Sequence, residues 1–340
     1  MKNRIMWTCA ALLGVASVGC GGDPAPTDAG TPGMDAGASC TPDGPPALAD
    51  AGAVPSMVTC PTPDGGTAGT GPCCYRVSQG STLANPELRL RYLDIREPAG
   101  SPLTSTLLLG VLNDALDRET FNWLFRVEGA DADGPVTIVT GFGLSNGDGT
   151  YAFPTGAGGG MTLDQERYRP LMVAGSLTGE SVRSERYDGE LTVPVLNTDG
   201  TAIQLELVLR NLQILDGTFN TERSCVGWSS SRGRFATGVL LDAFIEVETA
   251  RTGVISSGPV NTTVCAAVAG SVSNPMYCDQ PQSAWATPPD ALCDAAGCTA
   301  NADCEDDVCS RLGDATAGLP ACNAWHLVAG FAAQGVSITN

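Results

Sequence analysis

The sequence almost entirely lacks lysine and histidine. Lys2 is the only lysine and His326 the only histidine among 340 residues. The formal net charge is −19 at pH 7, and a chain this acidic is repelled by phosphate backbones and by anionic membrane surfaces. Nucleic acid is therefore excluded as a partner.

The apolar run nearest the N-terminus, residues 5–18, is too short to span a bilayer, which takes about 20 residues. It follows Lys2 and Arg4 and ends at Gly19-Cys20. A positively charged start, a short apolar run and a small-residue cleavage site are typical of an export signal, so we expect residues 1–19 to be a signal peptide. Because the segment ends in Gly-Cys, it resembles a bacterial lipoprotein signal. That resemblance implies that Cys20 carries lipid and is the only attachment to the membrane.

Metal-binding cysteine pairs are also missing, since the sequence contains no Cys-x₂-Cys. We therefore expect no thiol-bound metal, and nothing indicates another cofactor. Of the 14 cysteines, Cys9 lies in the expected signal and Cys20 would carry lipid. The others are even in number, which in an exported chain predicts a disulfide framework. Its candidate members are Cys40, Cys60, Cys73, Cys74, Cys225, Cys265, Cys278, Cys293, Cys298, Cys304, Cys309 and Cys322.

Aromatic residues are absent from residues 21–71, where Asp, Ala, Gly, Pro and Thr dominate. Such a segment cannot bury enough apolar surface to offset the entropy that ordering costs. We therefore predict a low-complexity acidic tether over residues 20–71. Asp-Ala-Gly recurs in it at Asp28-Ala29-Gly30, Asp35-Ala36-Gly37 and Asp50-Ala51-Gly52.

A Gly-Cys signal, Asp-Ala-Gly repeats and a cysteine-rich part together resemble the exported lipoproteins of myxobacterial type. The resemblance covers the signal, the tether and a short cysteine motif near the end of the chain. It implies a place in the cell envelope and says nothing of an activity. In lipoproteins generally, Asp directly after the lipidated cysteine retains the protein in the inner membrane. Gly21 stands there instead, so the resemblance implies the outer membrane.

Strand patterns dominate the remaining sequence. Short runs that alternate or are rich in β-formers predict strands at residues 88–95, 136–142, 171–177, 191–195, 203–214 and 234–243. Typical turn dipeptides separate them: Asn146-Gly147, Asp148-Gly149, Asp188-Gly189, Asp199-Gly200 and Asp216-Gly217. We predict a mainly β fold, an antiparallel β-sandwich-like domain over residues 72–260. A disulfide-rich C-terminal part, residues 261–340, should pack on the same body.

One or two helices are expected within this fold. Ser101 and Pro102 suit an N-cap and a first helical residue, and the apolar residues from Leu107 to Leu116 are spaced for one helical face. Residues 239–255 could contain another helix. Residues 325–333 are apolar enough for a short closing helix.

One motif suggests catalysis. Residues 143–147 match Gly-x-Ser-x-Gly, the nucleophile elbow of α/β hydrolases, with Ser145 as nucleophile and His326 downstream. That elbow requires a helix directly afterwards, whereas Asp148-Gly149 predicts a hairpin. We therefore interpret the motif as a β-turn and His326 as a packed or half-exposed residue, and we assign no catalytic residue.

Other motifs also favour structural interpretations. Residues 131–134 begin like a calcium-binding EF-hand loop, but Pro135 follows where further ligands are required, which indicates a turn. Residues 156–160 form a glycine-rich loop. Cys298, Cys304 and Cys309 lie near the acidic residues 303 and 305–307. Calcium could bind this acidic cluster, but we interpret the segment as a solvated loop pinned by disulfides. Three tryptophans could form a platform that stacks on a sugar: Trp123, Trp228 and Trp285. In a β-sandwich a tryptophan is more often part of the core, so we favour that interpretation.

Two classes of function follow. The first is a non-catalytic, lipid-anchored envelope protein, a structural module or one that binds carbohydrate, protein or another envelope component. The second is a carboxylate-dependent, glycosidase-like hydrolase. A cleft holding two carboxylates about 5–10 Å apart with shifted pKa values would favour the hydrolase.

Overall fold

The structure, a computed structural model, describes residues 58–59, 70–71, 82–154, 166–197, 199–220, 223–229, 235–236, 238–257, 260–300 and 321–339. The expected signal peptide with Cys20, and most of the expected tether, lie outside these residues. So do Cys40, Cys60, Cys73, Cys74, Cys304 and Cys309. Within the expected tether the structure describes two short antiparallel strands, β1 (Val58–Thr59) and β2 (Thr70–Gly71).

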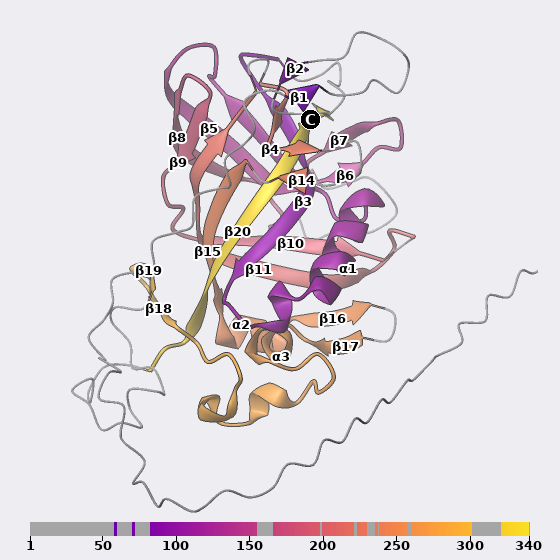
Figure 1. Ribbon diagram of the computed structural model, residues 1–340, viewed down its shortest axis with the longest axis vertical. Coiled ribbons are helices and arrows are strands. Elements are labelled where there is room, and N and C mark those ends of the chain that lie inside the picture. The colour runs from indigo at the N-terminus through magenta and orange to yellow at the C-terminus, as the bar shows by residue number, and fades with distance from the viewer. Residues whose placement is uncertain are drawn as a thin grey trace, which may run out of the picture. The chain divides into compact units, whose positions relative to one another are not determined.

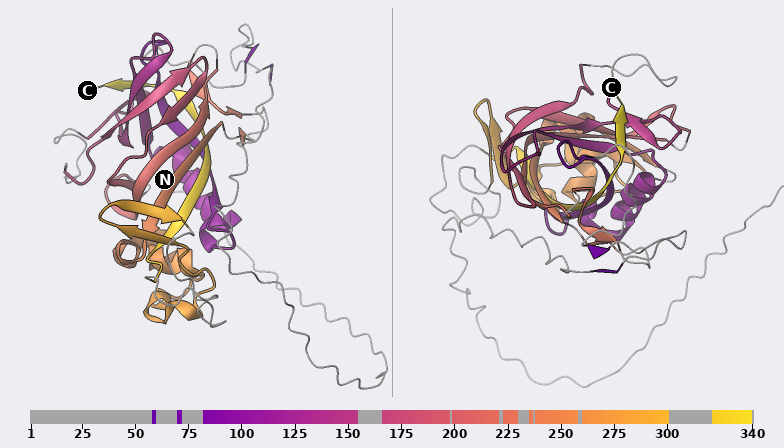
Figure 2. Two further views of the ribbon diagram at one scale, coloured as in Figure 1. Left: turned by 90° about the vertical axis from the view of Figure 1, so that its left-hand side faces the viewer. Right: turned by 90° about the horizontal axis from the view of Figure 1, so that it is seen from above.

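The main sheet has 14 strands, and part of it closes on itself (Figure 1 and Figure 2). Each strand of the closed part pairs antiparallel with its neighbours, and β11 pairs with both β9 and β15. In spatial order these strands are β3 (Glu87–Glu97), β4 (Trp123–Glu128), β5 (Gly134–Phe142), β8 (Leu171–Thr178), β9 (Ser181–Ser184), β11 (Ile203–Thr218), β15 (Val239–Glu246) and β20 (Ala324–Gly335). Opposite walls face one another across a common core, so the predicted mainly β, sandwich-like fold is confirmed.

The interior of the closed sheet is filled by side chains. One core cluster contains buried residues from all of its walls, including Leu90, Phe125, Leu241 and Phe331. One pocket among these side chains has a volume of about 20 Å³ and is lined by apolar residues. A cavity of that size holds about one water molecule, so the interior is a packed core.

The predicted closing helix over residues 325–333 is wrong, because that segment is the central strand β20. It pairs with β15 along one edge and with β3 along the other. Trp325, Leu327 and Phe331 face the core, while His326 and Val328 on the opposite face are buried as well. A strand buried on both faces is a continuous apolar run, and periodicity alone cannot distinguish it from a buried helix.

The helix α1 (Thr106–Asp117) lies where the apolar face predicted it, against β3 (Figure 1). Leu108, Leu112 and Leu116 are buried in the core. Its start is later than predicted: Ser101 caps the 3₁₀ turn η1 (Pro102–Thr104), and Ser105 caps α1 by accepting a hydrogen bond from the Leu108 amide. A second serine thus begins the α-helix after the proline turn has ended.

Most of the predicted turns lie between strands. Asn146-Gly147 and Asp148-Gly149 join β6 (Leu144–Ser145) to β7 (Thr150–Ala152), and Asp199-Gly200 joins β10 (Glu190–Leu196) to β11. Asp216-Gly217 is an exception, because both residues lie inside β11. A Cβ at Gly217 would be 2.9 Å from Val182 Cγ1, so this glycine permits close pairing with β9 and makes no turn.

The predicted strand over residues 234–243 is divided. Its start falls in β14 (Phe235–Ala236), which pairs with β13 (Trp228–Ser229), and its end in β15. A helix does follow β15, as the ambiguous pattern over residues 239–255 allowed. It is α2 (Val247–Thr252).

The C-terminal region packs at one end of the sheet and contains the described disulfides. The chain passes through β16 (Val254–Ser257), β17 (Val260–Thr263), α3 (Val264–Ala269), η2 (Tyr277–Asp279) and η3 (Gln282–Ala284). Figure 1 shows α2 and α3 side by side at the lower end of the sheet. A hairpin, β18 (Ala291–Asp294) and β19 (Gly297–Ala300), then leads towards β20, and β21 (Ser337–Thr339) pairs with β7.

The predicted disulfide bonds are confirmed within the described residues. Cys265–Cys278 ties α3 to η2, and Cys293–Cys298 ties β18 to β19. Cys225, which lies in β12 (Cys225–Val226), and Cys322 are disulfide-bonded as well. In the part of the chain that the structure describes, no helix has the length and apolar character needed to cross a membrane.

Candidate functional site

A groove lined by polar and charged side chains lies beside the start of β8. Its volume is about 520 Å³, which lies within the range of small-ligand sites. It is bounded by the segment before β8, the connection from β9 to β10, and parts of β10, β11 and α2. The lining residues are Glu166, Arg167, Arg169, Leu171, Tyr187, Gly189, Glu190, Thr192, Val208 and Thr249.

The segment before β8 is fixed by its inward-facing residues. Tyr168 is buried and its ring meets Phe142 edge-on, with 6.2 Å between ring centroids. Pro170 lies against β5, where a Cβ at Gly141 would be 3.0 Å from the proline Cα. Between these two anchors the exposed side chain of Arg169 contributes to the groove. The scaffold therefore holds the Arg169 backbone in place and leaves its guanidinium exposed.

A salt bridge fixes the same segment to β11. The Arg167 guanidinium forms a bidentate pair with Glu206, with Nε 2.8 Å from Oε1, and the Tyr168 hydroxyl donates to the same carboxylate. Bidentate arginine–carboxylate pairs fix geometry as well as adding energy. Arg167 thus serves the architecture of the groove.

The opposite wall depends on the Asp188-Gly189 turn that the sequence predicted. A Cβ at Gly189 would lie 2.5 Å from Cε1 of Tyr187, so only glycine leaves room for this ring. The Tyr187 amide donates to the Leu212 carbonyl at 2.8 Å, and the Asn211 amide donates to the Gly189 carbonyl at 3.0 Å. The turn is thereby fastened to β11, with Tyr187 at the groove.

A second cluster, which we call the His326 cluster, lies elsewhere on the outer face of β15 and β20. His326 Nε2 is 2.6 Å from Asp242 Oδ1, and the Arg186 guanidinium pairs with the other oxygen of that carboxylate. The imidazole stacks on Phe244 with 5.2 Å between ring centroids. Burial acts to raise the pKa of Asp242, but the hydrogen bond and charge of His326 and the charge of Arg186 outweigh it and lower that pKa.

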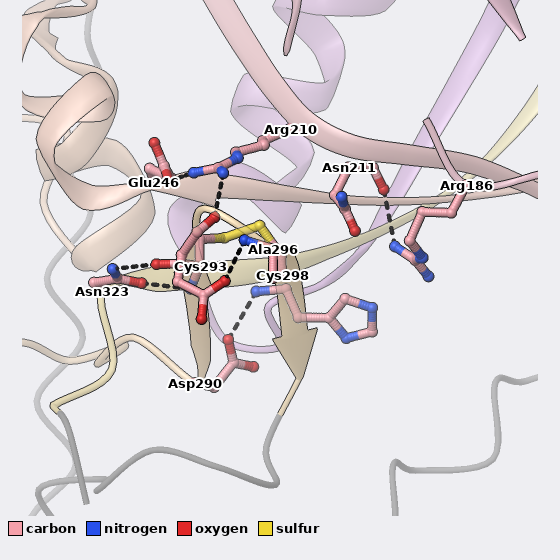
Figure 3. Close-up of a disulfide and its surroundings, with 11 residues drawn as sticks. Arg186, Arg210, Asn211, Glu246, Asp290, Cys293, Ala296, Cys298 and Asn323 are labelled. Carbon is pink, nitrogen blue, oxygen red and sulfur yellow. Dashed lines mark hydrogen bonds and ion pairs between the residues drawn. A yellow bond between two sulfur atoms is a disulfide. The ribbon is translucent and has the colours of Figure 1, made fainter. Parts of the chain in front are cut away.

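A second acidic residue contacts the same histidine. Asp290 Oδ1 accepts a hydrogen bond from the His326 backbone amide at 2.8 Å, and burial raises the pKa of Asp290. Figure 3 shows Asp290 below the Cys293–Cys298 bridge. The Asn323 side chain holds that hairpin through two hydrogen bonds. Its Oδ1 accepts from the Cys293 amide at 2.7 Å, and its Nδ2 donates to the Cys293 carbonyl at 2.8 Å. The hairpin packs on Phe244, so it covers part of the His326 cluster.

The structure separates Ser145 from His326. The Ser145 hydroxyl donates to Glu119 at 2.9 Å, as does the Tyr151 hydroxyl at 2.7 Å. Burial opposes ionisation of Glu119, but these two hydrogen bonds and the charge of Arg89 lower its pKa, while burial raises the pKa of Tyr151 to about 12. Ser145 thus belongs to the β6–β7 hairpin and has its own carboxylate, which agrees with the β-turn interpretation.

The remaining sequence candidates are structural or lie outside the described residues. Residues 131–134 form the turn from β4 to β5, and Asp133 accepts a hydrogen bond from the Gly179 amide at 2.8 Å. Trp123 and Trp285 are buried; the side chain of Trp228 lies outside the described residues, as do residues 156–160 and the acidic residues 303 and 305–307. Within the described ranges, no group of three or more His, Cys, Asp or Glu side chains could hold a metal ion.

Comparisons with protein-family models, curated proteins and solved structures found no match to this chain. No sequence motif points to Arg169 or Glu190, because neither belongs to a recognisable pattern. Asp242 did have a signal, because it is the one charged residue within the apolar stretch Val239–Ile245 of β15.

Proposed function

We propose that the protein is a non-catalytic, lipid-anchored module of the outer membrane that binds a carbohydrate or peptide component of the envelope in the groove. The groove carries this proposal: it has the volume of a small-ligand site, and a fixed frame holds polar and charged side chains around it. The apolar pocket in the interior of the sheet, by contrast, has room for about one water molecule. Disulfide bonds are compatible with an exported protein.

Lipid attachment is tested at Cys20. Cys20→Ser should move the protein from the membrane fraction to the soluble fraction, because the apolar run before it is too short to span a bilayer. Fractionation followed by immunoblotting measures this. If the variant sediments with membranes as firmly as the parent, Cys20 is not the anchor.

The hydrolase alternative has one observation in its favour. Asp242 and Asp290 both contact His326, and their pKa values are shifted in opposite directions, which is a pattern of acid–base pairs. Neither carboxylate lines the groove. Asp242 is also 5% exposed and paired with both His326 and Arg186. We therefore interpret the cluster as structural and favour binding.

The binding proposal is tested by filling the groove. Thr249, on α2, lines the groove, so Thr249→Trp should obstruct it. Purified full-length protein in detergent is sedimented with washed, membrane-free cell walls, and the bound fraction is measured. We expect the variant to lose at least about fivefold in affinity, which corresponds to roughly 1 kcal/mol.

A matched control comes from the same helix. Thr252 is exposed and does not line the groove, so Thr252→Trp should bind like the parent. Circular dichroism confirms that both variants are folded. Equal sedimentation of the parent and both variants would overturn the assignment of the groove.

A further inference from the structure

One groove residue differs from every other arginine that the structure describes. The chain has 37 acidic and 18 basic residues, so carboxylate partners are plentiful. Among the described arginines, each one except Arg169 has a hydrogen bond or ion pair to a carboxylate, a carbonyl or an amide oxygen. These are Arg89, Arg91, Arg96, Arg118, Arg126, Arg167, Arg183, Arg186, Arg210, Arg223 and Arg251.

Arg169 has no such partner among the described residues, although its neighbour Arg167 is paired with Glu206. Its backbone is held by Tyr168 and Pro170 on either side, so its place at the groove is fixed. A guanidinium presents a planar fork of donors that suits a carboxylate. Its position therefore suits an anionic group of a ligand.

Glu190 provides the opposite charge in the same groove. It is the first residue of β10, it is exposed, and its carboxylate has no polar partner among the described residues. Glu166 adds a second negative charge to the lining, so a purely anionic ligand would be repelled. The threonines Thr192 and Thr249 add hydroxyl groups.

We propose that the groove binds a small zwitterion, a short peptide with free ends, with its carboxylate at Arg169 and its ammonium at Glu190. This rests on the proposed function, since it names the ligand class of the same groove. Both contacts are charge-assisted hydrogen bonds, which are stronger than hydrogen bonds between neutral groups. A volume of about 520 Å³ accommodates a ligand of two or three residues.

Three forms of one dipeptide separate the two charges. The probes are alanyl-alanine, N-acetyl-alanyl-alanine, which lacks the ammonium, and alanyl-alanine amide, which lacks the carboxylate. Isothermal titration calorimetry on the full-length protein is run at low ionic strength, because salt screens exposed charges. The free dipeptide should bind about tenfold more tightly than either blocked form.

Charge-neutral variants assign each end to its residue. Arg169→Gln should bind the free dipeptide and the amide with equal affinity, and Glu190→Gln should bind the free dipeptide and the N-acetyl form equally. Arg118→Gln, at an exposed arginine that caps the C-terminal end of α1 and does not line the groove, should keep the full tenfold preference. If all three probes bind equally, or if Arg169→Gln keeps the preference over the amide, the proposal is wrong.

This outcome is separable from that of the proposed function. If no probe binds while Thr249→Trp still weakens cell-wall binding, the zwitterion proposal fails and the groove keeps its assignment. If Thr249→Trp has no effect either, both fail.

Discussion

Asp242→Asn is expected to reduce the free energy of unfolding by about 3 kcal/mol at pH 7. The variant replaces a buried carboxylate that pairs with both His326 and Arg186, and it leaves those two groups without the negative charge that faces them. Removing one member of a buried ion pair costs more than the pair itself contributes, because the remaining charge stays desolvated. Denaturation by urea, followed by circular dichroism, measures the change.

The contribution of Asp242 to stability depends on pH. The pKa of Asp242 is lowered in the fold, so its contribution is fully present above its unfolded pKa of about 4 and is lost as the pH falls through the folded value. The parent should therefore lose stability on acidification over that window, and Asp242→Asn should lose less. An identical acid dependence in both proteins would contradict the role assigned to Asp242.

Asp290→Asn is the matched control, and its expected effect has the opposite sign. Burial raises the pKa of Asp290, so the fold favours the protonated carboxyl and loses stability as the pH rises from the unfolded pKa through the folded one. Asparagine keeps an oxygen that can accept the His326 amide hydrogen bond and carries no charge. The variant should be as stable as the parent at pH 7 or more stable. A loss as large as that of Asp242→Asn would contradict this account.

Trp325→Ala is expected to cost about 4 kcal/mol, the largest loss among the single substitutions considered. Trp325 is fully buried in β20, stacks on Trp285 with 5.6 Å between ring centroids, and donates through Nε1 to the Thr287 carbonyl at 3.1 Å. Its removal leaves a cavity where the C-terminal region joins the sheet. Trp325→Phe keeps an aromatic ring and loses the hydrogen bond, so about 1–2 kcal/mol should be lost.

An exposed residue provides the baseline for this series. Met172 is 67% exposed on β8, and Met172→Ala should change stability by less than about 0.5 kcal/mol. If Trp325→Ala were as mild as Met172→Ala, β20 would not be the central strand described here.

The strands could be predicted because alternation and turn chemistry are local. Residues 88–95 and 136–142 lie within β3 and β5, and Asp188-Gly189 forms the turn before β10. The failures arise where long-range packing decides. β20 is buried on both faces by elements that are distant in sequence. Gly217 makes no turn, because a glycine is required there for close contact with Val182.

The groove could not be predicted from the sequence. It is assembled from residues 166–171, 187–192, Val208 and Thr249, which lie far apart along the chain. Whether Arg169 or Arg167 has a carboxylate partner depends on where β11 places Glu206, and no local pattern encodes that distance. The Asp242–His326 pair likewise joins two strands, although a lone aspartate in an apolar run was a visible indication.

Hydrogen–deuterium exchange with and without solubilised cell-wall fragments tests the central claim most directly, because it locates the bound ligand on the protein. The account predicts slower exchange in the segment before β8 and in β10, the two walls of the groove, with no change in the β18–β19 hairpin. Slower exchange at that hairpin and β20, with the groove segments unchanged, would contradict the groove and place the functional site at the His326 cluster instead.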